Sequence, residues 1–307
     1  PRKRSLASHW AGGSTGGSPT DLFTPAQERT GITPTQITIC AHAALTYAAA
    51  FNTSPDDLNV FWTALNAEKG GIYGRKVVET YEDDAYKPDQ AKIAAATCES
   101  KGIFFLLGGI GFDQIPSVRN YAEEHHLLYI HHTATLNGTK GQRYSFSLVP
   151  TTERTGEGFA QLARQRFAGK KIGILKRDSA NWEPGVVAFK AKAKEYGLSL
   201  IKPDEAVPQN AGDYSSQLQN LKNEGAQVVW IWLNALETTN VVQQMHAMNW
   251  TPDVMVFPFN LTSQTLGQQA LNPVMAGVAM YPAYSFGDYT GPFASYQDDM
   301  KEFERQY

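Results

Sequence analysis

The chain has 307 residues, enough for two domains, and an ordinary globular composition in which 42% of residues are hydrophobic and 19% are charged. Its net charge is −3 with scattered lysines and arginines, so it lacks the basic face that a nucleic-acid partner requires. No apolar run approaches the roughly 18 residues of a membrane span, and no apolar core follows the basic start "PRKR". We expect a soluble chain from which any export signal has already been removed.

Residues 1–30 differ in composition from the rest of the chain. The stretch "AGGSTGGSPT" is rich in glycine and serine, which is typical of a flexible linker that buries little apolar surface. We expect residues 1–30 to form a flexible tether, and this tether would be the only link to a membrane.

From Gly31 onward, predicted strands and helices alternate. "QITICAH" (36–42) is β-branched and predicts a strand, and Ser54 then caps a helix that begins at Pro55. Further strands are expected in "KVVETYED", "IFFLLGG", "LLYIHH", "YSFSLVP", "KKIGILK", "LSLIKPDEAV", "QVVWIWL" and "DVMVFPF". Further helices are expected over 88–101, about 116–125, 183–196, 214–224 and 237–248. Such alternation predicts an α/β fold with parallel sheets covered on both faces.

The alternation of strands and helices is interrupted near Pro150, which predicts two lobes. We expect residues 31–149 plus 284–307 to form the first lobe and residues 150–283 the second. The chain stops at Tyr307 inside an apparent amphipathic helix.

Ligands of open parallel sheets bind beyond the carboxyl ends of the strands. The loops in that position are 49–52, 111–114, 131–135, 179–182, 234–237 and 259–261. Two lobes that contribute such loops would enclose a cleft. By contrast, Trp230 and Trp232 lie in the middle of a strand on one face of the sheet, which predicts core packing.

Several kinds of chemistry are not indicated. His131 and His132 are adjacent and face opposite sides of a regular strand, so they are not expected to bind one metal ion. "GGIG" (108–111) lacks the spacing of a dinucleotide site, and no nucleophile elbow or zinc-protease motif is present. We expect no catalytic residues, no metal and no cofactor. Cys40 and Cys98 match no zinc or redox motif and are either buried thiols or one disulfide.

Two segments resemble a known family. "NAEKGGIYGRKVVETYEDDAYKPDQA" (66–91) and "GDYSSQLQNLKNEGAQVVWIW" (212–232) are similar to the type I periplasmic solute-binding proteins of ABC importers, in the leucine/isoleucine/valine-binding branch. The resemblance implies two Rossmann-like lobes joined by a hinge. Since family members continue with more of the first lobe, it also implies that the first lobe is C-terminally incomplete in this sequence. It also implies capture of a small solute in the cleft by hinge closure, in a monomer that delivers the solute to ABC permease subunits outside the cytoplasm.

The resemblance also assigns residues to the site. Thr135 matches a hydroxyl that holds the ligand carboxylate, and Trp182 an aromatic residue that closes over the ligand. Asn234 and Phe112 stand where the family has an aromatic residue and a serine. The expected ligand-binding residues are Phe51, Phe112, Asp113, Gln114, Thr133, Ala134, Thr135, Trp182, Asn234, Phe259 and Asn260.

One departure bears on the ligand. Phe259 stands where the family has the acidic residue that accepts a ligand ammonium, and loss of about 1.5–3 kcal/mol would weaken an amino acid by one to two decades. Asp113 or Glu237 could replace that acceptor. We therefore expect an organic acid or amino-acid-like solute with an apolar or aromatic body. The alternative function is a ligand-sensing receptor or regulator of the same fold.

Overall fold

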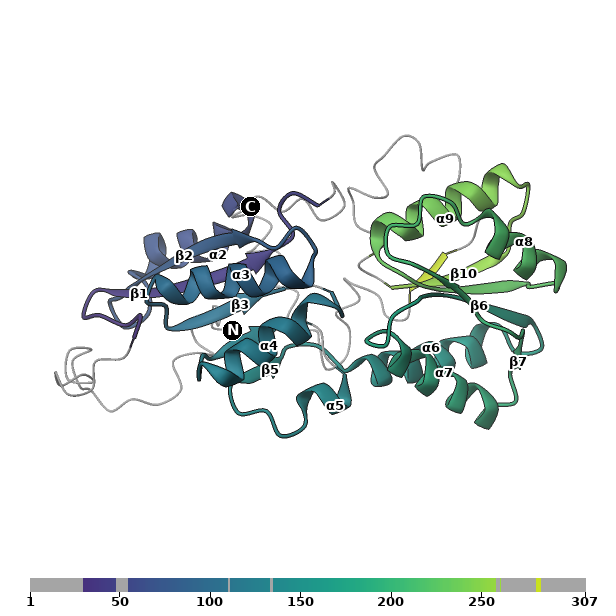
Figure 1. The fold of residues 1–307 in the computed structure, drawn as a ribbon, viewed down its shortest axis with the longest axis horizontal. Helices are drawn as coiled ribbons and strands as arrows, with labels where there is room; N and C mark the ends of the chain where they lie inside the picture. The colour runs from purple at the N-terminus through teal and green to yellow at the C-terminus, as the bar shows by residue number, and fades with distance from the viewer. Residues whose placement is uncertain are drawn as a thin grey trace, which may run out of the picture.

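A computed structural model describes residues 30–47, 55–109, 111–132, 135–257, 260 and 280–282. These residues form two separate parallel sheets, one in each of two lobes that lie side by side along the longest axis (Figure 1). The chain passes from the first lobe to the second between β5 and α6 (Figure 1). The predicted α/β architecture with parallel sheets is confirmed. The predicted tether up to residue 29 and residues 283–307 lie outside the described part of the chain.

The first lobe contains a five-stranded sheet in the order β2-β1-β3-β4-β5. Its strands are β1 (Gln36–Ala43), β2 (Lys76–Asp83), β3 (Phe105–Gly108), β4 (Tyr129–His131) and β5 (Ser145–Ser147). Its helices are α2 (Pro55–Lys69), α3 (Pro88–Ser100), α4 (Gln114–Glu124) and the short α5 (Leu136–Thr139). The step from β1 to β2 runs opposite to the later steps, so right-handed crossovers put α2 on one face and α3 with α4 on the other.

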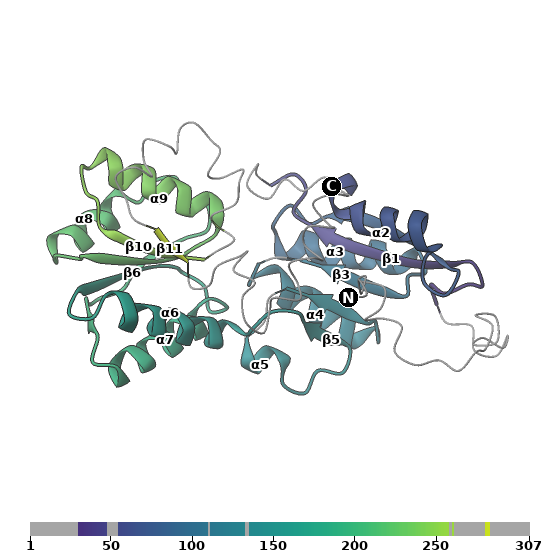
Figure 2. The ribbon, with the colours of Figure 1, turned by 180° about the vertical axis from the view of Figure 1, so that it is seen from behind.

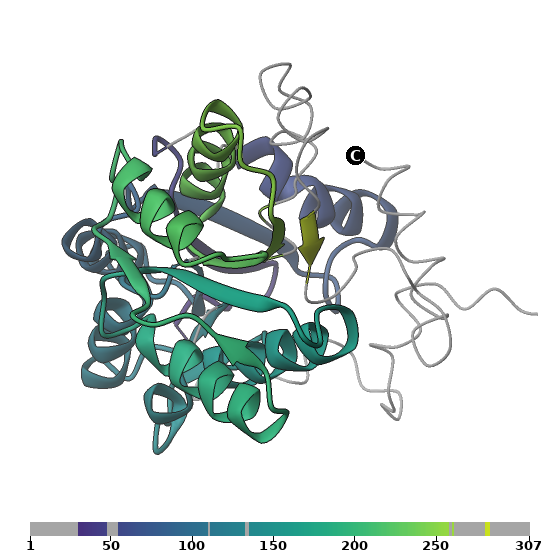
Figure 3. The same ribbon diagram turned by 90° about the vertical axis from the view of Figure 1, so that its right-hand side faces the viewer.

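The second lobe contains a sheet in the order β11-β10-β9-β6-β7, with β8 also pairing with β6. Its strands are β6 (Lys171–Arg177), β7 (Ser199–Leu200), β8 (Glu205–Val207), β9 (Val228–Trp232), β10 (Asp253–Val256) and β11 (Met280–Pro282). Its helices are α6 (Thr152–Arg166), α7 (Glu183–Glu195), α8 (Ser215–Asn223) and α9 (Ala235–Ala247). Helices α6 and α7 cover one face and α8 and α9 the other (Figures 1 and 3). Figure 2 shows β11 beside β10.

The core of the second lobe follows the alternation of strand β9. Trp230 and Trp232 are completely buried and pack against Phe159 and Phe189 of α6 and α7. Their neighbours along the strand point the other way, toward α8 and α9, because successive side chains alternate across a sheet. The prediction that both tryptophans are core residues is confirmed.

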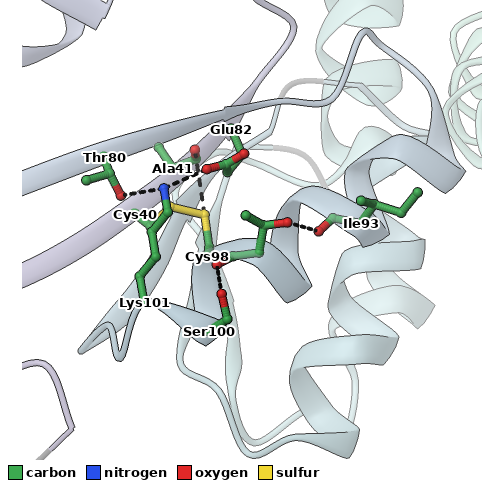
Figure 4. The surroundings of a disulfide bond; sticks show 9 residues. Cys40, Ala41, Thr80, Glu82, Ile93, Cys98, Ser100 and Lys101 are labelled. Atoms are coloured by element: carbon green, nitrogen blue, oxygen red, sulfur yellow. Dashed lines mark hydrogen bonds and ion pairs between the residues drawn. A yellow bond between two sulfur atoms is a disulfide. The ribbon is translucent and has the colours of Figure 1, made fainter.

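The first lobe has a core of smaller side chains around a disulfide. Cys40 of β1 is bonded to Cys98 of α3, with their Cα atoms 5.6 Å apart (Figure 4). Ala91 and Ala95 of α3 are completely buried, so the helix approaches the sheet closely. Of the two alternatives left open by the sequence, the structure has the disulfide.

Several boundaries differ from the prediction. The segment 198–207 is not one strand: β7 and β8 pair separately with β6, because Pro203 between them has no N–H for a ladder. Helix α9 begins at Ala235 rather than Glu237, since Asn234 and Glu237 form a capping box. Strand β11 was not predicted. None of the helices in the described ranges is long and apolar enough to cross a membrane.

Candidate functional site

An open pocket of about 440 Å³ lies where the two lobes meet. Its walls come from the first turn of α4 and the start of α3 in the first lobe, and from the loops after β6 and β8 in the second. The lining residues are Pro88, Asp113, Pro116, Ser117, Arg177, Asp178, Ser179, Asn181 and Gln209. The pocket therefore lies beyond the carboxyl ends of both sheets, as expected for a parallel α/β fold.

Phe112 reaches from the first lobe into the aromatic core of the second. Its ring centre lies 4.3 Å from that of Trp182, 5.8 Å from that of Trp232 and 6.1 Å from that of Phe257. Trp182 is itself only 3% exposed. The expected aromatic residues Phe112 and Trp182 thus come together, but they contact each other across the two lobes instead of lining an empty cleft.

Asp113 joins the two lobes by hydrogen bonds. Its carboxylate accepts from the hydroxyl of Ser179 (2.6 Å), the amide of Asn181 (3.1 Å) and the indole N–H of Trp182 (3.1 Å). All three donors belong to the loop between β6 and α7. Because these donors already engage both oxygens of the carboxylate, Asp113 is committed to holding the lobes together rather than to binding an ammonium group.

A second contact between the lobes centres on Tyr47, which follows β1. Its ring stacks on Tyr86 with centres 4.6 Å apart, and its hydroxyl donates to the side chain of Asn210. The side-chain amide of Asn234 donates to the same hydroxyl (3.4 Å), and that of Gln209 donates to the backbone oxygen of Tyr86 (3.3 Å). Burial raises the pKa of Tyr47 above its ordinary value. The predicted site residue Asn234 therefore lies at the interface.

Below these contacts, the second lobe holds a buried ion pair. Arg177 at the end of β6 and Glu237 in the first turn of α9 are each 1% exposed, and Nη2 of Arg177 donates to Glu237. Glu237 also accepts from the backbone N–H groups of Asn210 (2.9 Å) and Asn234 (3.3 Å). Burial raises the pKa of Glu237, and Arg177 opposes that rise.

Four buried side-chain atoms near this interface lack hydrogen-bond partners among the described residues. They are Nε and Nη1 of Arg177, and both amide atoms of Gln114, the first residue of α4. Gln114 packs against Gly111, where an added Cβ would lie 2.2 Å from its Oε1 and 3.0 Å from Tyr86. Unpaired buried polar groups cost about 1–3 kcal/mol each, and Arg177, which lines the pocket, suits contact with a bound molecule.

The remaining predicted residues are less closely associated with the pocket. Thr135 caps α5, where its hydroxyl accepts from the N–H of Gly138 (3.0 Å). Asn260 is buried and donates to the backbone oxygen of Leu233 (3.1 Å) and to Thr238 (2.7 Å). Phe51, Thr133, Ala134 and Phe259 lie outside the described residues.

The two adjacent histidines differ in burial, as expected for neighbouring residues of a strand. His131 is completely buried with its ring 4.9 Å from that of Tyr129, while His132 is exposed. Among the described residues, no group of three or more histidine, cysteine, aspartate or glutamate side chains could hold a metal ion.

Sequence reasoning missed a buried polar network in the first lobe. The ring nitrogens of His42 contact Asp84 (2.8 Å, Nδ1 to Oδ2) and the hydroxyl of Tyr129 (2.7 Å, Nε2 to Oη). The hydroxyl of Tyr129 lies 3.1 Å from the oxygen of Gly108, and a Cβ at Gly109 would lie 2.3 Å from the His42 ring. The network therefore supports the glycine turn that follows β3. The signals for it were His42 and Asp84, polar residues at the ends of two predicted strands.

Arg177 was also missed as a site residue, as were Tyr47 and Tyr86. The signal for Arg177 was its place at the end of "KKIGILKR", two residues after the apolar run. Such a position is the carboxyl end of a buried strand, where a parallel sheet binds its ligands.

Residues 46–307 match the family model described as periplasmic binding protein. The chain is 27% identical over 179 residues to Leu/Ile/Val-binding protein homolog 3 of Brucella melitensis, covering 58% of this chain and 48% of that protein. It is 25% identical over 186 residues to the Leu/Ile/Val/Thr-binding protein of Salmonella typhimurium, covering 60% and 50%. The chain thus spans about half the length of the curated relatives that it matches.

Solved structures share the fold. The branched-chain amino acid transporter substrate-binding protein LivJ of Streptococcus pneumoniae, in complex with isoleucine, has a TM-score of 0.73 at 17% identity, covering 89% of this chain and 77% of that one. A solute-binding protein of an R. palustris ABC transporter, in complex with benzoate, has a TM-score of 0.71 at 16% identity, covering 89% and 74%. At these identities the likeness concerns the fold alone. With a family model that covers most of its length, the chain belongs to the periplasmic binding protein family, in its type I fold and Leu/Ile/Val-binding branch.

Proposed function

We propose that this chain is the solute-binding component of an ABC importer and that it captures a small organic acid or amino-acid-like solute by hinge closure. The observation that carries the proposal is the pocket of about 440 Å³ with walls from both lobes. Its volume falls within the roughly 300–1,000 Å³ of small-molecule sites. A solute that contacts both lobes binds the closed arrangement better than the open one and so shifts the population toward closure.

The proposed solute has an apolar or aromatic body and a carboxylate head. The Brucella relative is named for binding leucine, isoleucine and valine, and the R. palustris structure contains benzoate. A carboxylate on an apolar body is common to all of these molecules. Asp113 and Glu237, the two carboxylates expected from the sequence as acceptors of a ligand ammonium, are already bonded to protein donors, which leaves only the exposed Asp178 among the described residues lining the pocket. This favours an organic acid over an amino acid.

We further propose that the protein acts outside the cytoplasm as a monomer and that its partners are the permease subunits of the transporter. Residues 1–30 would tether it to the membrane surface. The family name and the Cys40–Cys98 disulfide support this location, because disulfides persist in oxidising compartments.

Isothermal titration calorimetry with purified protein tests the proposed solute class. The panel contains benzoate, 3-phenylpropionate, 4-methylpentanoate, phenylalanine, leucine and glucose. We expect at least one carboxylate to bind with a dissociation constant near 1 μM (about −8 kcal/mol) and glucose not to bind. Binding of glucose alone, or of nothing in the panel, would contradict the proposal.

Small-angle X-ray scattering tests closure with the carboxylate that binds. We expect the radius of gyration to fall on addition of the solute, as the lobes approach. A profile that does not change with saturating solute would contradict hinge closure. Binding and closure without any interaction with permease subunits would instead favour the ligand-sensing alternative.

A further inference from the structure

We propose that Arg177 is the second-lobe anchor for the carboxylate of the solute, and that its bond to Glu237 occupies the position an α-ammonium group would need. The site then selects carboxylic acids that lack an α-amino group. This inference rests on the proposed function and names the substrate class of the same pocket.

Arg177 has the features of an anion-binding residue. It lines the pocket between the lobes while being only 1% exposed. A guanidinium has five N–H donors, and Nε and Nη1 carry three of them. Neither nitrogen has a hydrogen-bond partner in the described part of the chain. The Trp182 ring, 5.4 Å from the guanidinium carbon, supports the charge. A carboxylate oxygen would satisfy these donors with charge-assisted hydrogen bonds.

Glu237 explains the discrimination against amines. Its carboxylate accepts from Nη2 of Arg177 and from the backbone N–H groups of Asn210 and Asn234. A carboxylate offers about four acceptor positions, so three are already used by protein donors. Arg177 therefore supplies the cation that a ligand ammonium would otherwise provide. An amino acid would have to displace Arg177 or place its ammonium group beside the exposed Asp178, where solvent weakens an ion pair.

In the first lobe, Gln114 follows the lining residue Asp113 directly but lies behind the wall of the pocket. It is completely buried, and neither its Nε2 nor its Oε1 has a partner among the described residues. It lies beside Tyr86, whose electrostatic environment includes Arg177. Gln114 also begins α4, whose first turn lines the pocket, and helix N-termini favour negative charge. The first lobe thus contributes a helix N-terminus to the pocket, and the second contributes the donors of Arg177.

Two other carboxylates line the pocket and oppose an anion. Asp113 directs its charge toward three neutral donors of the β6–α7 loop, and Asp178 is exposed to solvent, where its field is screened. The resemblance to the family places the ligand carboxylate on the loop 131–135 instead. The two placements predict different effects of substituting Arg177.

Matched pairs of ligands isolate the amino group. Phenylalanine and 3-phenylpropionate differ only in the α-amino group, as do leucine and 4-methylpentanoate. By calorimetry at pH 7, we expect the wild-type protein to bind the acid of a pair at least tenfold more tightly than the amino acid. Tighter binding of the amino acid would overturn the inference while leaving the proposed function intact.

The Arg177→Met variant tests the anchor, and Lys176→Met is its control. Lys176 precedes Arg177, carries the same charge and pairs with Glu183 and Asp204 outside the pocket lining. We expect Arg177→Met to weaken the acid about 10- to 100-fold, as loss of hydrogen bonds to a charged group predicts, and Lys176→Met to change it less than threefold. The preference for acid over amino acid should fall at least tenfold in Arg177→Met, because Glu237 is released.

Removal of one partner leaves the other as an unpaired buried charge, which can unfold the protein. If Arg177→Met does not fold, the double variant Arg177→Met/Glu237→Gln replaces it in the binding experiments. It removes both charges and should lose the acid while gaining no amino acid. Acid binding at wild-type strength in either variant would overturn the inference. If no ligand binds the wild-type protein, the proposed function fails before the role of Arg177 is at issue.

Discussion

The two lobes repeat the same strand–helix unit but differ in what stabilises them. The first lobe has a core of small side chains, one disulfide, and a polar network of His42, Asp84 and Tyr129 at its strand ends. The second has a core of stacked aromatic rings, and an ion pair at its strand ends. In the first lobe, a covalent bond and directional hydrogen bonds support the turn beyond β3. In the second, close packing holds a charge in place beside the pocket. The difference indicates that the lobes respond to different perturbations.

The disulfide gives the largest expected effect. Cys40 and Cys98 are separated by 58 residues, and a loop of that length restricts the unfolded chain by about 4 kcal/mol at 25 °C. We expect Cys40→Ala/Cys98→Ala to lower the free energy of unfolding by about that amount, measured by urea titration followed by circular dichroism. Reductant should destabilise the wild-type protein and leave the double variant unchanged. An equal effect of reductant on both would contradict the assignment.

Removal of an aromatic ring from the second lobe should have a slightly smaller effect. Phe159 is completely buried, with its ring centre 5.3 Å from that of Trp230. We expect Phe159→Ala to lose about 3 kcal/mol through lost contacts and a cavity. Four of the six tryptophans follow residue 180, so tryptophan fluorescence mainly follows this lobe. The fluorescence transition should move to lower urea, and reductant should not reproduce this shift. If the first-lobe variant shifts fluorescence equally, the lobes unfold as one unit.

Much of this fold follows from patterns in the sequence. Alternating β-branched strands and amphipathic helices predict parallel sheets, and the mid-strand position of Trp230 and Trp232 predicts their burial. Element ends were less predictable because they depend on individual side chains. Asn234 and Glu237 together move the start of α9 by two residues, and Pro203 divides one expected strand into two.

The site was predictable by position but not by partner. Asp113, Gln114, Trp182 and Asn234 were expected in strand-end loops, and the structure brings them to the interface between the lobes. Their partners could not be predicted, since they lie in the other lobe or far along the chain. The pairing of Arg177 with Glu237 spans 60 residues and depends on the order of the strands in the sheet.

Removal of one hydroxyl from the polar network of the first lobe should lower the free energy of unfolding by a smaller amount. Tyr129→Phe removes the hydroxyl that contacts His42 and leaves a buried imidazole nitrogen unpaired. We expect a loss of about 1–2 kcal/mol in unfolding free energy, together with weaker solute binding because the turn at Gly109 loses support. Tyr121→Phe is the control, since its hydroxyl pairs with Glu99 away from the pocket. Equal loss of solute affinity in both variants would argue against a specific role for the network.

Asp83, at the end of β2, should give the smallest effect and the clearest dependence on pH. Burial raises the pKa of its carboxyl, but hydrogen bonds from Thr46, Ala85 and Leu45 outweigh burial and lower the pKa overall. A lowered pKa in the folded protein stabilises it above the unfolded-state pKa of about 3.9, and this contribution is lost as pH falls through the folded-state value. We expect Asp83→Asn to lose about 1 kcal/mol at pH 7 and progressively less toward acid pH.

Thermal melts of the wild-type protein and Asp83→Asn between pH 7 and pH 3 measure this convergence. Glu124→Gln makes the same change in net charge at an exposed position of α4 and should follow the wild-type protein across the range. A difference between Asp83→Asn and the wild-type protein that stayed constant with pH would mean that Asp83 acts through the shape of the turn alone. The expected convergence would instead assign the effect to its charge, since only the ionised carboxylate gains from the N–H groups directed at it.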